Sequence, residues 1–208
     1  MSRQFKKAKP LIQVFCEGES EQAYTDFLKK QFEDVAVIRR PKATGLFDEA
    51  DALYRKNVRY KNSAEVTDEI WFFFDVETKD IDKWNDRLDI INHLRKLRKK
   101  PNIKVRLLMT TGCIEYWLML HYKMYAPPLQ TVSEKERVIS EIVTKEPTYS
   151  KGNMQATFKI AQNYPVAVKN SEMTVKNLLQ DGLPVFPKQK DIKKQPMFTC
   201  LQTKEYCY

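Results

Sequence analysis

Two short acidic segments each follow a hydrophobic run that is typical of a buried strand. Residues 11–15 (LIQVF) precede Glu17, and residues 70–74 (IWFFF) precede Asp75 and Glu77. In an open parallel sheet, ligands bind beyond the carboxyl ends of the strands, so two strands can bring their carboxylates to one site. Hard oxygen ligands of this kind suit Mg²⁺ or Mn²⁺, which retain waters and a substrate phosphate. The pattern therefore predicts metal-dependent chemistry on a polyanion.

The spacing of these acids adds detail to the predicted site. Asp75 and Glu77 are two residues apart, which in extended backbone points both side chains to the same side. A metal held there would stabilise an attacking or leaving oxygen in phosphodiester cleavage, while another carboxylate moves protons. Glu19 and Glu21 have two open interpretations, because acids in the first turn of a helix also stabilise that helix through its dipole. Glu21 is therefore either a site residue or a helix cap.

Positive charge is the second chemical signal. The chain has 36 basic and 27 acidic residues, a net charge of +9. This excess suggests an anionic partner, nucleic acid before membrane. Arg39, Arg40 and Lys42 follow the second predicted strand, at the edge where the carboxylates should gather. They are candidate contacts to a phosphate backbone, and binding through them would weaken with salt.

Strands alternating with amphipathic helices must position these side chains. Hydrophobic runs predict strands at 11–16, 35–38, 70–75 and 103–109. Helical spacing predicts helices at about 20–32, 47–59 and 81–99. Strands separated by helices of this length imply βαβ units, so the expected fold is α/β with a mostly parallel sheet flanked by helices.

The second half of the chain has a different pattern. It predicts helices at 114–122, 133–143, 152–163 and 171–179, followed by a tail with several prolines and lysines. The chain therefore divides near residue 125. Residues 1–125 form the α/β core, and residues 126–208 form a mainly helical extension with a basic tail, which we expect to pack on the core.

Several classes of protein do not fit the composition. No apolar stretch approaches the roughly 18 residues needed to span a bilayer, and the charged N-terminus lacks the apolar block of a signal peptide, so we expect a cytoplasmic protein without a membrane partner. The sequence has four cysteines without CxxC or other paired spacing and only two histidines, so no zinc motif is present. The sequence contains no P-loop, GxGxxG, GxSxG or HExxH motif. If ATP is involved, a partner is expected to hydrolyse it.

Four blocks of the sequence together resemble the RloB-like family. They are VFCEGESEQAYTDFL at 14–28, FFFDVET at 72–78, TTGCIEYWLMLHY at 110–122 and YSKGNMQATFKIAQ at 149–162. The blocks occur in the family's order and span about residues 11–165. The third block departs from the usual pattern, because Thr111 and Gly112 stand where Asn-Pro is usual.

The resemblance implies a Toprim-like fold and a nuclease linked to bacterial anti-phage and restriction loci, often beside an ATPase. Carried over, the Toprim glutamate falls on Glu17, as proton donor or acceptor, and the acidic pair falls on Asp75 and Glu77, as ligands of Mg²⁺ or Mn²⁺. Glu77 replaces the usual second aspartate. Lys151, in the Tyr-x-Lys block, is a candidate to neutralise phosphate charge. Toprim nucleases of defence systems commonly work in assemblies, so a homo-oligomer is also an expectation.

Glu115 and His121 lie in an otherwise apolar predicted helix. Six residues separate them, so on a regular helix their side chains point about 120° apart and do not form a simple ligand pair. Both demand partners, because burying either alone is costly. His121 is either a hydrogen-bonded structural residue or part of the site. Glu115 follows the fourth predicted strand at the same sheet edge as the other acids, where it is a candidate catalytic residue or further ligand.

Two functions stay open at this point. The first is a divalent-metal-dependent nuclease that cleaves DNA or RNA in a prokaryotic defence system. The second is a non-catalytic subunit that binds nucleic acid or an ATPase on a degenerate Toprim scaffold.

Overall fold

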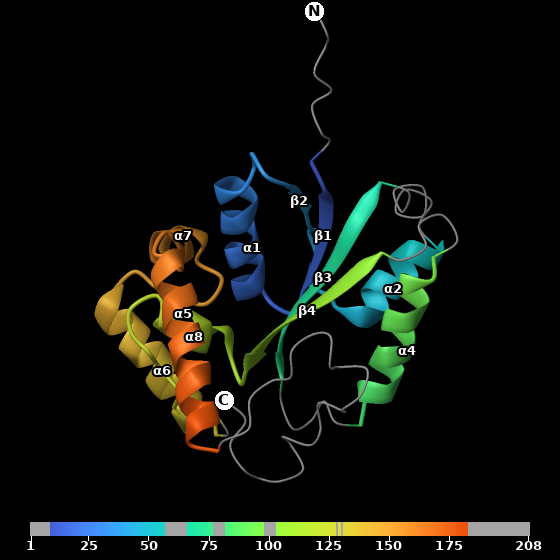
Figure 1. The fold of residues 1–208 in the computed structure, drawn as a ribbon. Helices are drawn as coiled ribbons and strands as arrows, with labels where there is room; N and C mark the ends of the chain where they lie inside the picture. The colour runs from blue at the N-terminus through green and yellow to red at the C-terminus, as the bar shows by residue number, and fades with distance from the viewer. Residues whose placement is uncertain are drawn as a thin grey trace, which may run out of the picture.

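The structure is a computed structural model that describes residues 9–56, 66–76, 82–97, 103–127, 129 and 131–182. Four parallel strands form one sheet in the order β2-β1-β3-β4 (Figure 1). Their bounds are β1 Leu11–Cys16, β2 Val37–Arg39, β3 Thr67–Val76 and β4 Lys104–Thr111. The predicted α/β class is confirmed, with a parallel sheet flanked by helices and a helical C-terminal part.

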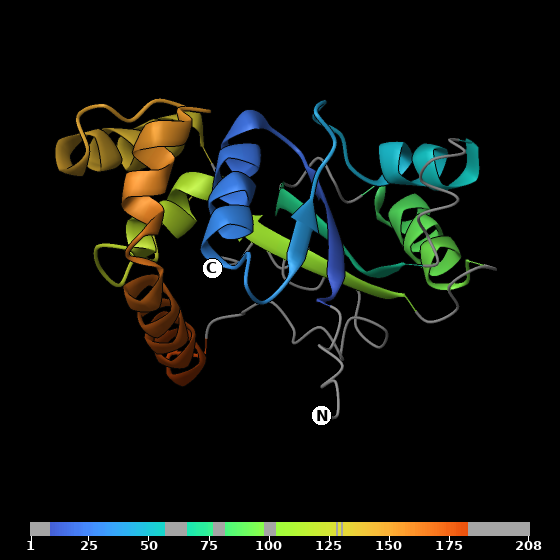
Figure 2. The same cartoon turned by 90° about the horizontal axis from the view of Figure 1, so that it is seen from above.

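Helices cover both faces of the sheet (Figure 2). One face carries α2 (Phe47–Lys56) and α4 (Trp84–Arg95). The other carries α1 (Glu19–Gln31), α5 (Ile114–Leu120), α6 (Val132–Lys145), α7 (Met154–Ala161) and α8 (Tyr164–Gln180), directly or through one another. None of the described helices is long and apolar enough to cross a membrane.

The aromatic run in β3 explains why both faces are covered. Side chains alternate between the faces of a strand, so Phe72 and Phe74 point to the α2 and α4 side while Phe73 points to α1. All three rings are buried. A strand that is apolar on both faces is stable only between two layers of helices.

The core on the α1 side joins the two halves of the chain. It combines Val14 of β1 and Tyr24 of α1 with Ile142 of α6 and Ile160 of α7. These residues lie on both sides of position 125, where the sequence predicts a domain boundary. The boundary stays a prediction, but the residues after it share one hydrophobic cluster with the sheet.

Some element bounds differ from the predicted ones. β2 begins at Val37, two residues later than expected, because its register pairs Val37 with Leu11 of β1. α8 begins at Tyr164 rather than Ser171, with Pro165 in its first turn. Proline is tolerated there because the first amides of a helix have no partner within the helix.

The strand order creates a crevice at one edge of the sheet. The connection after β1 leads to β2, whereas the connection after β3 leads to β4 on the other side. The strands that follow β1 and β3 therefore lie on opposite sides of this central pair. Such a topological switch point is where open parallel sheets bind ligands. Glu17 follows β1 at this point, and Asp75 is the penultimate residue of β3.

Candidate functional site

A cavity of about 420 Å³ lies at the switch point. Five carboxylates line it: Glu17, Glu19, Glu21, Asp75 and Glu115. Two lysines, Lys135 and Lys151, line it as well. We call it the acidic cavity. It brings together five of the residues expected from the sequence, Glu17, Glu21, Asp75, Glu115 and Lys151.

The pairing of β3 with its neighbours fixes the position and direction of the Asp75 side chain. Asp75 is two residues beyond Phe73, so it points to the same face of the sheet, towards α1. Its register partner in β4 is Thr110, whose hydroxyl donates a hydrogen bond to the Asp75 carboxylate. The backbone amide of Asp75 donates to Glu17 Oε2 at 2.9 Å. Glu17 and Asp75 therefore meet directly across the gap between β1 and β3.

The pKa of Asp75 reflects its burial close to the other carboxylates. Burial is the main cause that raises it from 3.8 to about 7; repulsion from the carboxylates of Glu21, Glu17 and Glu115 contributes, and the Thr110 hydrogen bond acts in the opposite direction. Burial likewise raises the pKa of Glu21, with contributions from Glu17 and Glu115. The folded protein therefore holds negative charge here at a cost, which a bound cation would offset.

Glu21 fits both of its predicted interpretations. Its Oε2 accepts a hydrogen bond from the amide of Gly18, the residue before α1, at 3.0 Å. This contact satisfies an amide that the helix leaves without a partner. The same side chain is buried and lines the acidic cavity.

Glu115 lies in the first turn of α5 with only 1% of its surface exposed. The hydroxyl of Tyr149 donates to Glu115 Oε1 at 2.9 Å. Burial and the neighbouring charge of Glu115 raise the pKa of Tyr149, so the phenol stays protonated and remains a donor. Tyr149 thus holds one oxygen of Glu115, a contact that the sequence analysis did not predict.

The loop that carries Lys151 docks on the start of α1. Gly152 has a φ of 75°, a conformation that favours glycine, and its amide donates to Ser20 Oγ at 3.1 Å. A Cβ at position 152 would meet Glu19 Oε2 at 2.8 Å. Glycine therefore permits the close approach that places Lys151 at the cavity.

Lys135 is a cavity residue that the sequence analysis missed. It follows the Thr131–Glu134 capping box in the first turn of α6. α6 reaches the sheet edge because Gly112, with a φ of 69°, lets Leu129 approach to a distance at which a Cβ would clash. The capping box is visible in the sequence, but the helix's place beside the acidic cavity depends on this tertiary contact.

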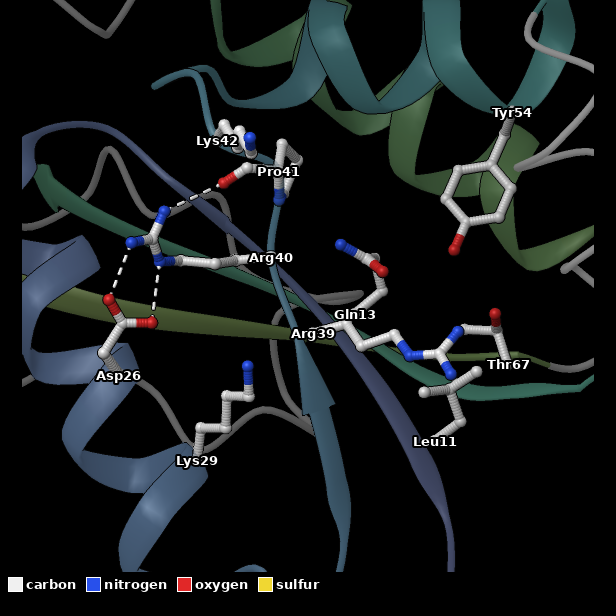
Figure 3. A pocket seen from close by; sticks show the side chains of 10 residues that line it. All are labelled: Leu11, Gln13, Asp26, Lys29, Arg39, Arg40, Pro41, Lys42, Tyr54 and Thr67. Carbon is white, nitrogen blue, oxygen red and sulfur yellow. Dashed lines mark hydrogen bonds and ion pairs between the residues drawn. The ribbon is translucent and has the colours of Figure 1, made fainter.

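Arg39, Arg40 and Lys42 line a different cavity, of about 530 Å³ (Figure 3). No residue lines both cavities. β2 pairs only with Leu11–Gln13, so it ends well before the level of Glu17. The three basic residues therefore surround the edge strand rather than the carboxylates. We call this second space the basic cavity.

His121 is buried away from the acidic cavity. Its Nδ1 lies 3.0 Å from the carbonyl oxygen of Trp117, so this nitrogen carries the proton, and Nε2 accepts from the Tyr24 hydroxyl at 3.2 Å. Burial lowers the pKa of His121 to about 4, so the ring is neutral near pH 7. These contacts fit the interpretation of His121 as a hydrogen-bonded structural residue. Glu115 lies in the first turn of α5, whereas His121 lies at the other end of the helix, at its C-cap.

The oxygen donors suit a hard divalent cation in type, but they do not yet form a ligand shell. Among the described residues, no three His, Cys, Asp or Glu side chains are grouped closely enough to hold a metal ion. The oxygens are instead hydrogen-bonded to the amides of Asp75 and Gly18 and to the hydroxyls of Thr110 and Tyr149. Glu77, the other predicted ligand, lies outside the described residues.

The sequence profile of the family described as RloB-like protein matches residues 12–189 of the 208. The protein belongs to the RloB-like family. The matched segment contains every lining residue of the two cavities except Leu11, and it ends beyond α8. A search of curated proteins found no match. Membership of the RloB-like family confirms the resemblance drawn from the four sequence blocks.

Proposed function

We propose that this RloB-like protein is a divalent-metal-dependent nuclease that cleaves phosphodiester bonds in DNA or RNA. One observation carries the proposal: Glu17 after β1, Glu21 of α1, Asp75 of β3 and Glu115 of α5 converge on one cavity at the topological switch point. Concentrated carboxylates with a raised pKa at such a place are typical of a functional site.

Asp75 and Glu17 are the proposed ligands of Mg²⁺ or Mn²⁺, with Glu77 as a further ligand. When bound, the metal supplies the positive charge that stabilises a developing negative charge on the phosphate oxygens. Thr110 and the amide of Asp75 hold the two carboxylates in place through their hydrogen bonds. Removing either support would let the carboxylates rotate away from the shared position.

The chain also offers proton-transferring and phosphate-binding groups. Glu17 and Glu115 are the proposed proton-transferring carboxylates, and the Tyr149 hydrogen bond fixes the orientation of Glu115. Lys151 and Lys135 line the same cavity and would attract the phosphate into a space that otherwise repels it. Lys151 is exposed, which suits contact with a large substrate.

A role in prokaryotic anti-phage defence, together with an ATPase partner, is the biological part of the proposal. Its support is the membership of the RloB-like family. The Toprim-like character of the core has the same support, together with the parallel sheet and the position of Glu17 and Asp75 at its carboxyl edge.

A second candidate function has a specific observation in its favour. The carboxylates of the acidic cavity already accept hydrogen bonds within the protein, and no metal-binding group forms among the described residues. A non-catalytic subunit that binds nucleic acid or an ATPase on a degenerate scaffold fits this arrangement. It predicts binding without cleavage.

The test is cleavage of plasmid DNA, single-stranded DNA and total tRNA by purified protein with Mn²⁺, Mg²⁺ or EDTA. The inactive variant is the double substitution Glu17→Ala, Asp75→Ala. Its matched control is Glu172→Ala, Asp181→Ala, which removes two exposed acids at or near α8. Metal-dependent cleavage by the wild type and the control, lost in the first double variant, is the expected result.

Cleavage that persists unchanged in the Glu17→Ala, Asp75→Ala protein would not depend on the assigned site and would contradict its role in the observed activity. Absence of cleavage even after addition of the proposed ATPase partner, with nucleic-acid binding retained, would establish the second candidate.

A further inference from the structure

The basic cavity contains a buried amide without a partner. Gln13 lies in the middle of β1, has only 6% of its surface exposed and lines the cavity. Among the residues that the structure describes, its Nε2 has no hydrogen-bond partner. Burying a polar group without a partner is unfavourable, so such a group in a cavity wall is a candidate for contact with a ligand.

The strand register places Arg39 beside Gln13 in the sheet. Gln13 and Arg39 are register partners in β1 and β2, so their side chains leave the sheet on the same face. The neighbouring residue, Arg40, points to the opposite side of β2 (Figure 3). Figure 3 also shows the Gln13 amide between Pro41 and the ring of Tyr54. The amide is therefore at the inner end of the cavity, whereas Arg39 is exposed at its rim.

The charge of the basic cavity is not balanced by acids. Asp26 is its acidic lining residue, and both Asp26 oxygens are engaged by Arg40, at 2.7 and 3.0 Å. Within the described part of the chain, no ion pair joins Lys29, Arg39 or Lys42 to a carboxylate. Three exposed cations and one buried donor thus face a space whose volume is within the range of small-ligand sites.

We propose that the basic cavity binds a terminal phosphate group, one that ends a nucleic-acid strand or belongs to a free nucleotide. The planar guanidinium of Arg39 matches two phosphate oxygens, and the Gln13 amide donates to a third at the inner end. A terminal phosphate carries about −1.5 to −2 charges at pH 7 and three acceptor oxygens, which suits this set of donors.

The depth of Gln13 distinguishes a terminal phosphate from an internal one. A sugar–phosphate backbone that crosses the rim would meet Arg39 and Lys42, which are exposed, but not the buried amide of Gln13. Only a phosphate at the end of a chain or on a small molecule enters far enough. This site needs no divalent metal, because its donors are cations and an amide.

The phosphate site itself does not depend on the proposed nuclease activity. Its assignment to strand ends does rest on that activity, because a nuclease that acts on nucleic acid would meet such ends as substrate or product. The two proposals use separate cavities that share no lining residue, so their failures are distinguishable.

The experiment measures binding of fluorescent oligonucleotides to the full chain by anisotropy, in EDTA. The oligonucleotides carry a 5′-phosphate, a 3′-phosphate or no terminal phosphate, and inorganic phosphate and AMP serve as competitors. We expect one phosphorylated end to bind roughly tenfold more tightly than the unphosphorylated oligonucleotide, the effect of one or two hydrogen bonds to a charged group. Both competitors should reduce this preference.

Three variants decide the assignment. Arg39→Gln should weaken binding of the phosphorylated end by roughly 10- to 100-fold. Gln13→Leu, which keeps the size of the side chain and all cations, should remove the preference for the phosphorylated end while leaving binding of the unphosphorylated oligonucleotide unchanged. Lys176→Gln is the matched control for charge, because Lys176 is exposed on α8, and should retain the preference.

Equal binding of all oligonucleotides, together with no competition by AMP or phosphate, would overturn the proposal. So would a preference that Gln13→Leu leaves intact. Competition by AMP without any preference for phosphorylated ends supports the phosphate site and assigns it to a free nucleotide. If cleavage fails even with the proposed ATPase partner added while Arg39-dependent binding persists, the nuclease proposal falls and the phosphate site stands.

Discussion

The acidic and the basic cavities place opposite charges at different positions on one sheet. The acidic cavity lies at the carboxyl ends of the central strands β1 and β3, whereas the basic cavity surrounds the short edge strand β2. In the acidic cavity each central carboxylate is held by a hydrogen bond from an amide or hydroxyl. In the basic cavity the long cationic side chains are exposed, and Arg40 alone is held firmly by an acid.

This difference teaches what each cavity needs from its ligand. Carboxylates that raise one another's pKa need a cation before they can approach a phosphate. Exposed lysines and arginines bind a phosphate without any such help, and less specifically. We therefore expect variants in one cavity to leave the chemistry of the other unchanged.

The largest expected effect is a loss of cleavage from a change in the acidic cavity, with phosphate binding in the basic cavity unchanged. Asp75→Asn keeps the side-chain shape but removes a carboxylate charge from the acidic cavity, so metal-dependent cleavage should fall by roughly 10²-fold or more. Binding of a phosphorylated oligonucleotide in EDTA should not change. Cleavage rates and anisotropy on the same preparation check both parts, with Asp181→Asn as the control. Full activity of Asp75→Asn would end the nuclease mechanism.

The second effect concerns the buried histidine at the end of α5, His121. The pKa of His121 is about 4 in the folded protein and 6.5 in an unfolded chain, so the unfolded state binds the proton more tightly. The free energy of unfolding should therefore fall as the pH drops from about 6.5 to 4, by about 3 kcal/mol from this group.

Urea unfolding of the wild type and of His121→Gln across this pH range measures that contribution as a difference in slope. His93→Gln is the matched control, because His93 is the other histidine and is half-buried on α4. Equal slopes for the wild type and His121→Gln would mean that the imidazole is not held neutral.

The third effect tests the loop that closes the acidic cavity. Gly152→Ala places a Cβ at a positive φ and against Glu19, so it should cost about 1–2 kcal/mol from backbone conformation alone, plus the cost of displacing the loop. Gly182→Ala is the control, since Gly182 has a φ of 72° and nothing within 4 Å of the new Cβ. Urea unfolding compares the two.

The part of the Gly152→Ala effect that exceeds Gly182→Ala reports the contact with α1. This variant should also reduce cleavage, because Lys151 moves with the loop, and leave phosphate binding in the basic cavity intact. Equal destabilisation by the two substitutions would show that the loop is not packed on Glu19.

The smallest effect is a gain of stability on the basic side. Gln13→Leu removes a buried amide that has no partner among the described residues, so the free energy of unfolding should rise by about 1 kcal/mol. Thermal and urea unfolding measure the change. A clear loss of stability would indicate that the amide is satisfied in the folded protein, and would weaken the case for its contact with a phosphate.

The sequence was sufficient to predict the residues fixed by local pattern. Glu17 and Asp75 end two hydrophobic runs, and the structure places them at adjacent strand ends joined by a hydrogen bond. The alternation of strands and helices predicted the parallel sheet for the same reason. Period and composition decide such features, and no distant contact is needed to recognise them.

Residues whose place depends on tertiary contacts were not predictable. The position of Arg39 follows from the pairing of Val37 with Leu11, which no local pattern specifies. Lys135 reaches the acidic cavity only because Leu129 packs against Gly112. The partner of Glu115, Tyr149, lies 34 residues away along the chain. In each case the chemistry of the side chain was visible, but its neighbours were not.

The hydrogen bond from Gly152 to Ser20 joins residues 132 positions apart. A ribosome that has made β1, α1 and the whole sheet has therefore not yet produced the residues that complete the acidic cavity. Loop closure over this distance is slow compared with helix formation or contacts between neighbouring elements. Completion of the site is thus delayed until late in synthesis, which for the proposed nuclease would keep an unfinished chain from cutting the cell's own nucleic acid.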